Sequence, residues 1–294
     1  MPTASDRSRL ISIVQSRQNA RVRELRAAFA RSPRDGTEVI GIEGEHLLAE
    51  ALRSGLRLRT VFLRADPDRR DTSLRILERL ALPAAVPIVS LNPAVFSSAV
   101  DTESPQGIAA LLEPPHFSFA EALGELDTPM PRATHPAPLV LITAALQDPG
   151  NFGSLIRSAE AFGATGVIAL PGTVDVWNGK ALRASAGSAF RVPVVPEKSP
   201  IAFATLGERK IPILAAVAAT ASSGSIPCSE YDLTRPAAIL IGNEGSGLSQ
   251  DLLDRAQARI AIPMPGPVES LNAAVAASIL LYEAARQRSA QQNQ

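Results

Sequence analysis

The amino-acid sequence predicts an α/β protein with two domains, of which the larger contains a mainly parallel sheet. Short apolar runs alternate with helical patterns along most of the chain, as strands do when helices connect them. A proline-rich stretch interrupts this alternation, and 294 residues suffice for two domains. Near the end of the chain, two apolar runs stop at turns rich in Gly or Pro, which is how an open α/β sheet forms a ligand crevice.

Residues 1–113 predict the smaller domain. Apolar residues recur at helical spacing between 18 and 32, with arginines around them, so we expect a helix there. Short β-branched or leucine-rich runs then alternate with helical stretches. We expect strands at 39–42, 60–63, 86–89 and 108–112, and helices at 43–54 and 73–81.

Residues 114–138 contain six prolines and little periodicity outside 117–126, which predicts a linker. The larger domain follows at 139–294. Its expected strands are 139–143, 166–170, 213–217 and 237–241, and its expected helices include 152–162 and 269–288. Because strands and helices alternate here, the sheet of this domain should be mainly parallel.

The composition excludes several classes of protein. Apolar residues make up 46% of the chain and aromatic residues 4%, so the core should be aliphatic. No apolar run reaches the ~18 residues of a membrane-spanning helix, and the first residues lack the apolar stretch of a signal peptide. We therefore expect a cytoplasmic protein with no membrane partner.

The cysteine and histidine content argues against a metal site. Cys228 is the single cysteine, which excludes an internal disulfide and a multi-cysteine metal site. We interpret it as a small buried or loop residue. The three histidines, His46, His116 and His135, lie far apart and in no ligand spacing, so we expect no metal.

Positive charge is concentrated at the start of a chain whose net charge is zero. Residues 1–34 contain eight arginines against one aspartate and one glutamate, which leaves a net charge of +6. Such a run is compatible with a solvated surface helix or with a surface that contacts phosphate backbone. The charge pattern by itself does not decide between the two.

Two common phosphate-binding motifs are absent from the glycine-rich segments. The segment Gly245-Ser246-Gly247 has Gln250 where a dinucleotide fingerprint needs glycine, and it lacks the Lys-Ser/Thr pair of a P-loop. Gly179-Lys180 is followed by alanine, and Val174 stands where the first P-loop glycine would be. Neither NAD chemistry nor ATP hydrolysis is supported by a motif.

Three segments carry the residues that suggest a function. The first, 146–159, contains the turn Asp148-Pro149-Gly150, then Asn151 as a plausible helix N-cap and Arg157 in the second turn of the helix. The second is 239–248, and the third comprises 260–264 and 268–276. The first segment should lie near the carboxyl edge of the sheet, although Asn151 taken alone is equally well explained as a simple cap.

These three segments, in this order, resemble the SpoU (TrmH) family of the SPOUT class, which are RNA ribose 2′-O-methyltransferases that use S-adenosyl-L-methionine. Further similarity extends over 180–193, and Glu43-Gly44 and 104–108 are similar to the substrate-binding domain of these enzymes. The matching residues are Asn151, Gly153 and Arg157 in the first segment, Gly242-Asn243-Glu244-Gly245 and Gly247-Leu248 in the second, and Ile262-Pro263-Met264, Ser270-Leu271-Asn272-Ala273 and Ala276 in the third. One departure is Thr143-Ala144-Ala145, where the family usually has an Asp-containing strand end.

The resemblance implies a fold and a set of binding residues. It implies a C-terminal parallel-sheet SPOUT domain with a trefoil knot, a smaller N-terminal α/β domain that binds the RNA substrate, and a homodimer, to which the helix at 269–288 could contribute. The implied cofactor residues are Gly242, Asn243, Gly247, Ile262, Met264, Leu271 and Ala276. The implied catalytic residues are Arg157, Asn151, Glu244, Ser270 and Asn272. The arginines expected to contact RNA are Arg17, Arg21, Arg23 and Arg183.

The chemistry of the implied reaction suggests a role for Arg157. A guanidinium group is effectively always protonated in proteins, so it is a poor general base. We hypothesise that Arg157 stabilises developing alkoxide charge and anchors the neighbouring phosphate. The other four implied catalytic residues would orient the hydroxyl and hold Arg157.

The substrate is left open by the residues themselves. Ribosomal RNA is favoured because the N-terminal domain resembles those of ribosomal-RNA and antibiotic-resistance members of the family. The alternatives are a tRNA 2′-O-methyltransferase and a non-catalytic RNA-binding or ribosome-assembly protein of the same fold. A nucleotide-dependent oxidoreductase is disfavoured by the missing fingerprint.

Overall fold

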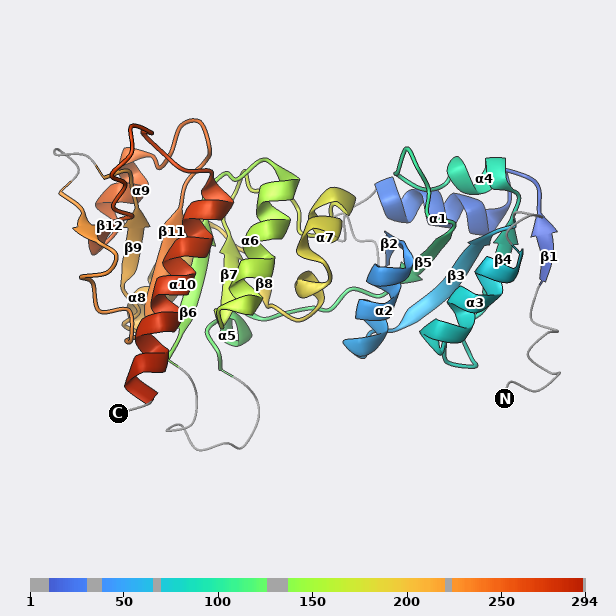
Figure 1. Ribbon diagram of the computed structural model, residues 1–294, viewed down its shortest axis with the longest axis horizontal. Coiled ribbons are helices and arrows are strands. Elements are labelled where there is room, and N and C mark those ends of the chain that lie inside the picture. Colours follow the sequence, from blue (N-terminus) through green and yellow to red (C-terminus); the bar gives the residue numbers. More distant parts are fainter. Residues whose placement is uncertain (1–10, 31–38, 66–69, 126–136, 220–223, 293–294) are drawn as a thin grey trace. The chain divides into compact units, whose positions relative to one another are not determined.

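The computed structural model describes residues 11–30, 39–65, 70–125, 137–219 and 224–292 (Figure 1). The chain forms two compact units. Unit 1 comprises residues 1–115 and 177–190, and unit 2 comprises residues 116–176 and 191–294. Segment 177–190 therefore belongs to unit 1, although the sequence places it within the second half of the chain.

Unit 1 contains a mixed five-stranded sheet. The strand order is β1-β4-β3-β5-β2, in which β5 runs antiparallel to both of its neighbours and the other pairs are parallel. The strands are β1 (Ile11–Val14), β2 (Ile40–Glu43), β3 (Leu58–Arg64), β4 (Ile88–Leu91) and β5 (Ile108–Leu112). The helices are α1 (Ala20–Ala30), α2 (Glu45–Arg53), α3 (Arg70–Leu80), α4 (Pro93–Ser97) and α7 (Gly179–Ser185).

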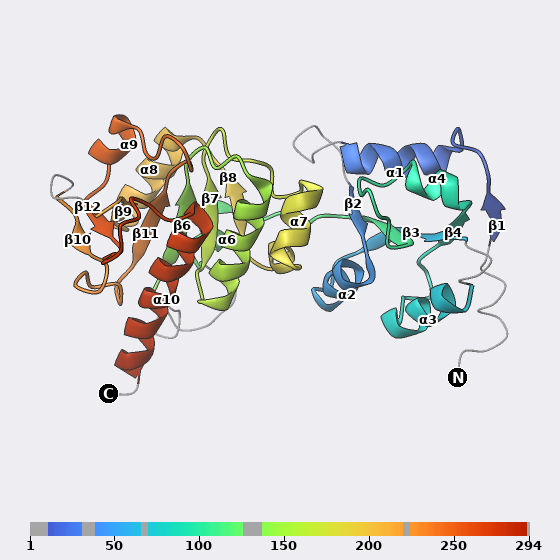
Figure 2. The same cartoon turned by 45° about the horizontal axis from the view of Figure 1, so that its top comes forward.

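Helices cover both faces of this sheet, which buries its aliphatic strands (Figure 2). On one face, α1 packs Val22 and Leu25 against Phe62 and Phe96. Each of these four side chains is fully buried. The helical spacing of apolar residues in α1 therefore forms the inner face of the helix and leaves its arginines outside.

Unit 2 is built on a seven-stranded sheet in which every pairing is parallel. The strand order is β10-β12-β9-β11-β6-β7-β8. The strands are β6 (Leu139–Thr143), β7 (Gly166–Ala169), β8 (Val194–Pro196), β9 (Ile213–Ala216), β10 (Ile226–Pro227), β11 (Ala237–Ile241) and β12 (Ala258–Ala261). The helices are α5 (Phe119–Ala122), α6 (Pro149–Ala161), α8 (Ser199–Glu208), α9 (Gln250–Asp254) and α10 (Ala273–Gln292).

The two faces of this sheet are covered by different helices. Helices α6 and α10 lie side by side on one face (Figures 1 and 2). Residues of α5, α8 and α9 pack against the strands on the other face. Thus the two helices that begin within the first and third functional segments, α6 and α10, share one layer.

The predicted elements are confirmed, with shifts of a few residues at their ends. The structure also contains β1, β8, β10, β12, α4, α5, α7, α8 and α9, whose bounds the sequence did not predict. Helix α10 begins at Ala273 rather than at residue 269, because the Asn272 side-chain oxygen accepts from the Ala274 and Val275 N–H groups and so caps the helix at this point. The parallel sheet predicted for the larger domain is confirmed.

The prediction that Asn151 caps its helix was wrong. The N-cap of α6 is Asp148, whose Oδ1 accepts a hydrogen bond of 2.7 Å from the Asn151 backbone N–H. Pro149 then occupies the first helical position, where a missing N–H costs nothing. The side chain of Asn151 is therefore available for other contacts.

Arg288 ties the last helix to the start of two central strands. Its guanidinium donates hydrogen bonds to the backbone carbonyls of Ala137 and Pro138 before β6 and of Leu233 and Arg235 before β11. Burial lowers the pKa of Arg288 from its ordinary value. These contacts fix α10 to the amino edge of the sheet, so its first turn is held at the carboxyl edge.

Several composition-based expectations can be compared with the described residues. None of the helices that the structure describes is long and apolar enough to cross a membrane. The described parts of the chain contain no group of three or more His, Cys, Asp or Glu side chains that could hold a metal ion. Cys228 is buried, as we interpreted it, and burial raises the pKa of its thiol.

Candidate functional site

A cavity of about 340 Å³ lies at the carboxyl ends of β9, β11 and β12. Its walls are mainly aliphatic side chains and glycine backbone. All seven residues expected to bind a cofactor line it: Gly242, Asn243, Gly247, Ile262, Met264, Leu271 and Ala276. Glu244 and Ser270 line it as well. The second and third functional segments thus form one site, as the parallel arrangement of their strands predicts.

The glycine-rich loop after β11 is a tight turn held by one side chain. The backbone of Asn243 exchanges hydrogen bonds of 3.1 and 3.0 Å with that of Gly247. The Asn243 Oδ1 accepts from the N–H groups of Gly245 and Ser246, and its Nδ2 donates to the Ala145 carbonyl at 2.7 Å. The Asn243 amide therefore shapes the loop, and what it offers to the cavity is chiefly backbone.

Gly242 is required by close packing within this loop. A Cβ atom at this position would lie 2.5 Å from the Gly247 carbonyl carbon and 2.8 Å from the Leu248 nitrogen. By contrast, a Cβ on Gly245 would have its nearest neighbour, the Asn243 Oδ1, at 3.5 Å. Only the first of these two glycines is needed for the approach of two backbone segments.

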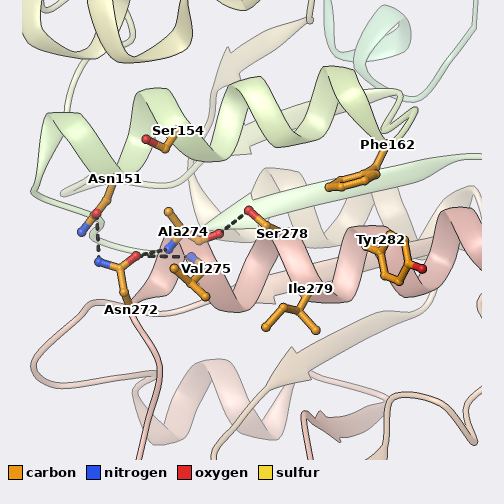
Figure 3. A pocket seen from close by; sticks show the side chains of 9 residues that line it. All are labelled: Asn151, Ser154, Phe162, Asn272, Ala274, Val275, Ser278, Ile279 and Tyr282. Carbon is orange, nitrogen blue, oxygen red and sulfur yellow. Dashed lines mark hydrogen bonds between the residues drawn. The ribbon is translucent and has the colours of Figure 1, made fainter.

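A chain of side-chain hydrogen bonds connects the three functional segments. Asn272 Nδ2 donates to Asn151 Oδ1 at 2.9 Å, and Asn151 Nδ2 donates to Glu244 Oε1 at 3.0 Å. At its other end, Asn272 Oδ1 accepts from the backbone N–H groups of Ala274 and Val275 in the first turn of α10 (Figure 3). We call Asn272, Asn151 and Glu244 the amide chain.

A second cavity, of about 530 Å³, lies along α6 and α10. Figure 3 shows Asn151 and Asn272 at one end of it and the edge-to-face pair Phe162 and Tyr282 at the other. The helices are joined there by a hydrogen bond of 2.7 Å between the hydroxyl groups of Ser158 and Ser278. The cavity was not predicted from the sequence. The signal that could have indicated it is the repeat of apolar residues on the outer face of α10.

That outer face is unusually apolar for a surface. Val275, Ile279 and Tyr282 are 47%, 37% and 55% exposed. Their spacing of four and three residues places them on one stripe of α10. A contiguous apolar stripe at the surface is typical of a protein–protein contact.

Arg157 is the one implied catalytic residue that the structure does not bring to the others. It is exposed, lines neither cavity, and has no hydrogen-bond or ion-pair partner among the described residues. It lies six positions after Asn151 on α6, which turns the two side chains roughly 120° apart around the helix axis. Within one chain, Arg157 is thus not held by the amide chain or by Ser270.

The four arginines expected to contact RNA all lie in unit 1. Arg183 is on α7, and Arg17, Arg21 and Arg23 are on or just before α1. Arg21 donates to the Thr60 hydroxyl at 3.4 Å and lies 3.7 Å from Glu24. Arg17 and Arg23 are exposed and have no such partner in the part of the chain that the structure describes.

The other arginines of residues 1–34, which we call the basic arm, divide in a similar way. Arg26 donates to the Ser98 carbonyl at 3.2 Å and to the Ser98 hydroxyl at 3.4 Å, so it ties α1 to α4. Arginines 7, 9, 31 and 34 lie outside the described residues. The charge count of the arm alone did not distinguish arginines that hold the fold from arginines that face solvent.

Comparison with known proteins agrees with this geometry. Residues 138–282 match the SpoU rRNA Methylase family, and residues 19–110 match the MRM3-like substrate binding domain. The chain is 32% identical over 269 residues to the 23S rRNA (guanosine(2553)-2'-O)-methyltransferase RlmP of Bacillus subtilis (strain 168), which covers 92% of this chain and 97% of that protein.

Solved structures of rRNA and SpoU methyltransferases are similar to this chain in fold. The SpoU methyltransferase AviRb from Streptomyces viridochromogenes, in complex with the cofactor AdoMet, has a TM-score of 0.76 and 29% identity, over 92% of this chain and 99% of that one. The AdoMet-bound rRNA methyltransferase from Sinorhizobium meliloti has a TM-score of 0.72 and 27% identity, over 94% and 97% of the two chains. Similarity of sequence and fold extends over nearly the whole length, so this chain belongs to the SpoU rRNA methylase family.

Proposed function

We propose that this protein transfers a methyl group from S-adenosyl-L-methionine to a ribose 2′-hydroxyl of RNA, with ribosomal RNA as the substrate. The observation that carries the proposal is the amide chain, which brings Glu244 to the cavity formed by the loops at 242–248 and 262–272. The proposal is supported by relatives named as rRNA 2′-O-methyltransferases and by a neighbour bound to AdoMet.

The first cavity suits the proposed cofactor. Its volume of about 340 Å³ lies within the range of small-molecule sites, and its walls combine aliphatic side chains with glycine residues. Gly242, Ile262 and Leu271 would hold the cofactor through backbone, with Met264 and Ala276 against its apolar parts. When bound, the cofactor supplies an activated methyl group on a positively charged sulfur.

The protein contributes position and electrostatics to such a transfer. An in-line displacement needs the hydroxyl oxygen close to the methyl carbon and aligned with the bond that breaks. Glu244, which accepts a hydrogen bond from Asn151, lies where it would orient the hydroxyl at the cavity, and Ser270 lines the same cavity. Arg157 would stabilise the negative charge that develops on the oxygen and bind the adjacent phosphate.

Ribosomal RNA is favoured over tRNA by the presence of unit 1. Residues 19–110 match a substrate-binding domain, and one relative that aligns over nearly its full length is named for 23S rRNA. A non-catalytic RNA-binding protein of the same fold would not need the amide chain to end on a carboxylate at the cavity. An enzyme that modifies ribosomal RNA acts where ribosomes are assembled, so we place it in the cytoplasm.

Two features of the architecture are part of this proposal. We propose that the chain divides along the sequence into domains at 1–113 and 139–294 with 114–138 as linker, of which residues 126–136 lie outside the described residues. By packing, segment 177–190 groups with unit 1, and residues 116–125 group with unit 2. We also propose that the C-terminal segment forms the trefoil knot of the SPOUT class. The convergence of the 242–248 and 262–272 loops on one cavity supports the knot.

We further propose that the protein acts as a homodimer. The apolar stripe of Val275, Ile279 and Tyr282 is exposed and lines the second cavity, so a second copy could cover both. Arg157 reaches neither cavity within its own chain. Pairing of two copies along α6 and α10 would cover the stripe and bring Arg157 to the cofactor cavity of the other copy.

The arginines of unit 1 are proposed to bind phosphate groups of the RNA. Arg17, Arg23 and Arg183 are exposed on this unit. Arg21 donates a hydrogen bond to Thr60 and forms an ion pair with Glu24, and Arg26 donates to Ser98. Arg17 and Arg23 are therefore the arginines of α1 and its approach whose charge is most available to RNA.

The proposed reaction predicts a ribose methylation that depends on the protein. Purified protein with S-adenosyl-L-methionine should methylate ribosomal RNA taken from cells that lack the gene, at a nucleotide found by mapping 2′-O-methyl marks across total RNA. Arg157→Lys should lower turnover by about 10²-fold, since an ammonium does not replace a planar bidentate donor. Loss of a mark on tRNA alone would refute the rRNA substrate, and binding of RNA without methylation would support the non-catalytic alternative.

The glycine loop predicts a steric test of cofactor binding. Gly242→Ala should weaken binding of S-adenosyl-L-methionine by about 5- to 150-fold, because overpacking costs typically about 1–3 kcal/mol and the clash is with backbone. Gly245→Ala is the matched control, since it adds the same methyl group without a clash. Isothermal titration calorimetry measures both; equal affinities of the two variants would argue against the cofactor position.

The division among the arginines predicts different salt dependences. Replacing Arg17 and Arg23 together by alanine should reduce the slope of log affinity against log salt by about 2, one for each lost phosphate contact. Arg26→Ala, which removes an arginine of the same helix that is bound to Ser98, is the control and should change the slope much less. An unchanged slope for the double variant would mean that the arm is only a solvated surface.

The homodimer predicts complementation between two inactive variants. Chains with Arg157→Ala and chains with Glu244→Gln, co-expressed and purified as the mixed dimer population, should recover about one quarter of wild-type turnover, since half the dimers are mixed and each has one intact site. Each variant alone should be nearly inactive. Mixed dimers without activity would show that Arg157 serves its own chain, and a monomer by analytical ultracentrifugation would refute the dimer.

A further inference from the structure

The amide chain has a direction, and α10 sets it. Asn272 Oδ1 accepts hydrogen bonds of 2.9 and 3.3 Å from the backbone N–H groups of Ala274 and Val275. Exchanging the oxygen and nitrogen of this amide would place its NH₂ group against those N–H donors. The first turn of the helix therefore requires the Asn272 oxygen on its side and the nitrogen on the other.

The direction passes from Asn272 through Asn151 to Glu244. Asn272 Nδ2 donates to Asn151 Oδ1, which leaves the Asn151 nitrogen to point at Glu244 Oε1. Each amide uses its oxygen toward the helix and its nitrogen toward Glu244. The chain must consequently end on an acceptor, and a carboxylate is the stronger acceptor for an N–H donor.

Glu244 retains acceptor capacity at the cavity. Among the described residues, Asn151 is the group that donates to its carboxylate, through Oε1, and the side chain is exposed. Glu244 lines the proposed cofactor cavity, whereas Asn151 and Asn272 line the cavity along α6 and α10. The amide chain thus runs from one cavity to the other and leaves Glu244 Oε2 available beside the cofactor cavity.

We propose that Glu244 is the proton acceptor for the RNA hydroxyl and that Asn272 and Asn151 are positioning residues that transmit the geometry of the α10 N-terminus to it. This assignment rests on the proposed function. As the ribose oxygen forms its bond to the methyl carbon, the bond from that carbon to sulfur breaks and the sulfur becomes a neutral thioether. The hydroxyl proton passes to the Glu244 carboxylate and then, because this side chain is exposed, to water.

Arg157, Glu244 and the two asparagines have separate roles in this assignment. A guanidinium such as that of Arg157 can stabilise an anion but holds its own proton, so the proton needs another acceptor. Glu244 is the carboxylate that lines the cavity. The two asparagines do not exchange protons with the substrate; they fix where one carboxylate oxygen lies.

The first variant reverses the chain and preserves the cap. In Asn272→Asp, a carboxylate still accepts from the first turn of α10, and aspartate is as good an N-cap as asparagine. It cannot donate to Asn151, so the Asn151 amide loses its orientation and Glu244 loses its donor. We expect Tm to fall by roughly 2–4 °C and kcat to fall by about 10²-fold, with affinity for S-adenosyl-L-methionine by calorimetry unchanged.

The second variant removes the proton acceptor and preserves the chain. In Glu244→Gln, the side-chain amide oxygen still accepts from Asn151 Nδ2. We expect wild-type Tm and cofactor affinity, and kcat lower by about 10²-fold or more, as for loss of a general base.

The double variant distinguishes a chemical role from a structural one. When Asn272→Asp and Glu244→Gln are combined, the side-chain amide of Asn151 can exchange the positions of its oxygen and nitrogen. It then donates to the new carboxylate at 272 and accepts from the new amide at 244. Both hydrogen bonds between side chains of the amide chain are thus formed again in the opposite direction. We expect Tm to return to the wild-type value while kcat stays low. Recovery of both Tm and kcat would overturn the proposal, because the chain would then act only through stability.

Activity of the wild-type protein and of Asn272→Asp together distinguish a failure of this inference from a failure of the proposed function. If the wild-type protein transfers no methyl group to RNA, the proposed function fails, and Tm and calorimetry still report whether the chain has its stated direction. If the wild-type protein is active and Asn272→Asp keeps its kcat, the proposed function stands and the positioning role of Asn272 is refuted.

Discussion

The geometry of the site depends on the hydrogen bonds that Asn151 makes with Asn272 and Glu244. These bonds join residues that lie 121 and 93 positions apart in the chain. A parallel sheet brings the carboxyl ends of its strands to one edge, but it does not determine how the loops at that edge meet. Each hydrogen bond contributes only about 0.5–1.5 kcal/mol net, so their importance lies in direction. Because Asn272 also caps α10, the site inherits the rigidity of a helix that Arg288 fixes at its other end.

Much of the fold and of the cofactor cavity could be predicted from the sequence, because both depend on local patterns. Helical spacing places Val22 and Leu25 on the buried face of α1, and the apolar runs of β6 and β11 are fully buried strands. The residues around the cavity follow directly after such strands, so their convergence is a consequence of parallel topology. The tight turn at Gly242 could likewise be read from glycine spacing, although the backbone contact that requires it could not.

Which residue caps a helix and which arginine makes a contact could not be predicted, because several residues in the sequence are equally suitable for each role. Asp148 and Asn151 are both good N-caps, and the structure uses Asp148 since Pro149 can occupy the first helical position. Arg21 and Arg23 have the same charge and nearby places on α1, yet Arg21 faces Thr60. The position of Arg157 relative to Asn151 follows from the rotation of the helix once its start is known. A wrong helix start therefore conceals which side chains share a face.

Ala145 shows how local strain can be hidden from sequence reasoning. It has a φ of 53°, in the left-handed region, which costs an L-residue such as alanine about 1–2 kcal/mol. Its carbonyl accepts from Asn243, the side chain that shapes the loop at the cofactor cavity. The sequence gives no sign of a left-handed residue here, because alanine is common in ordinary helices and strands. Ala145 precedes the first functional segment, and the hydrogen bond from Asn243 to its carbonyl connects this place to the second segment. This contact offsets the cost of the left-handed backbone.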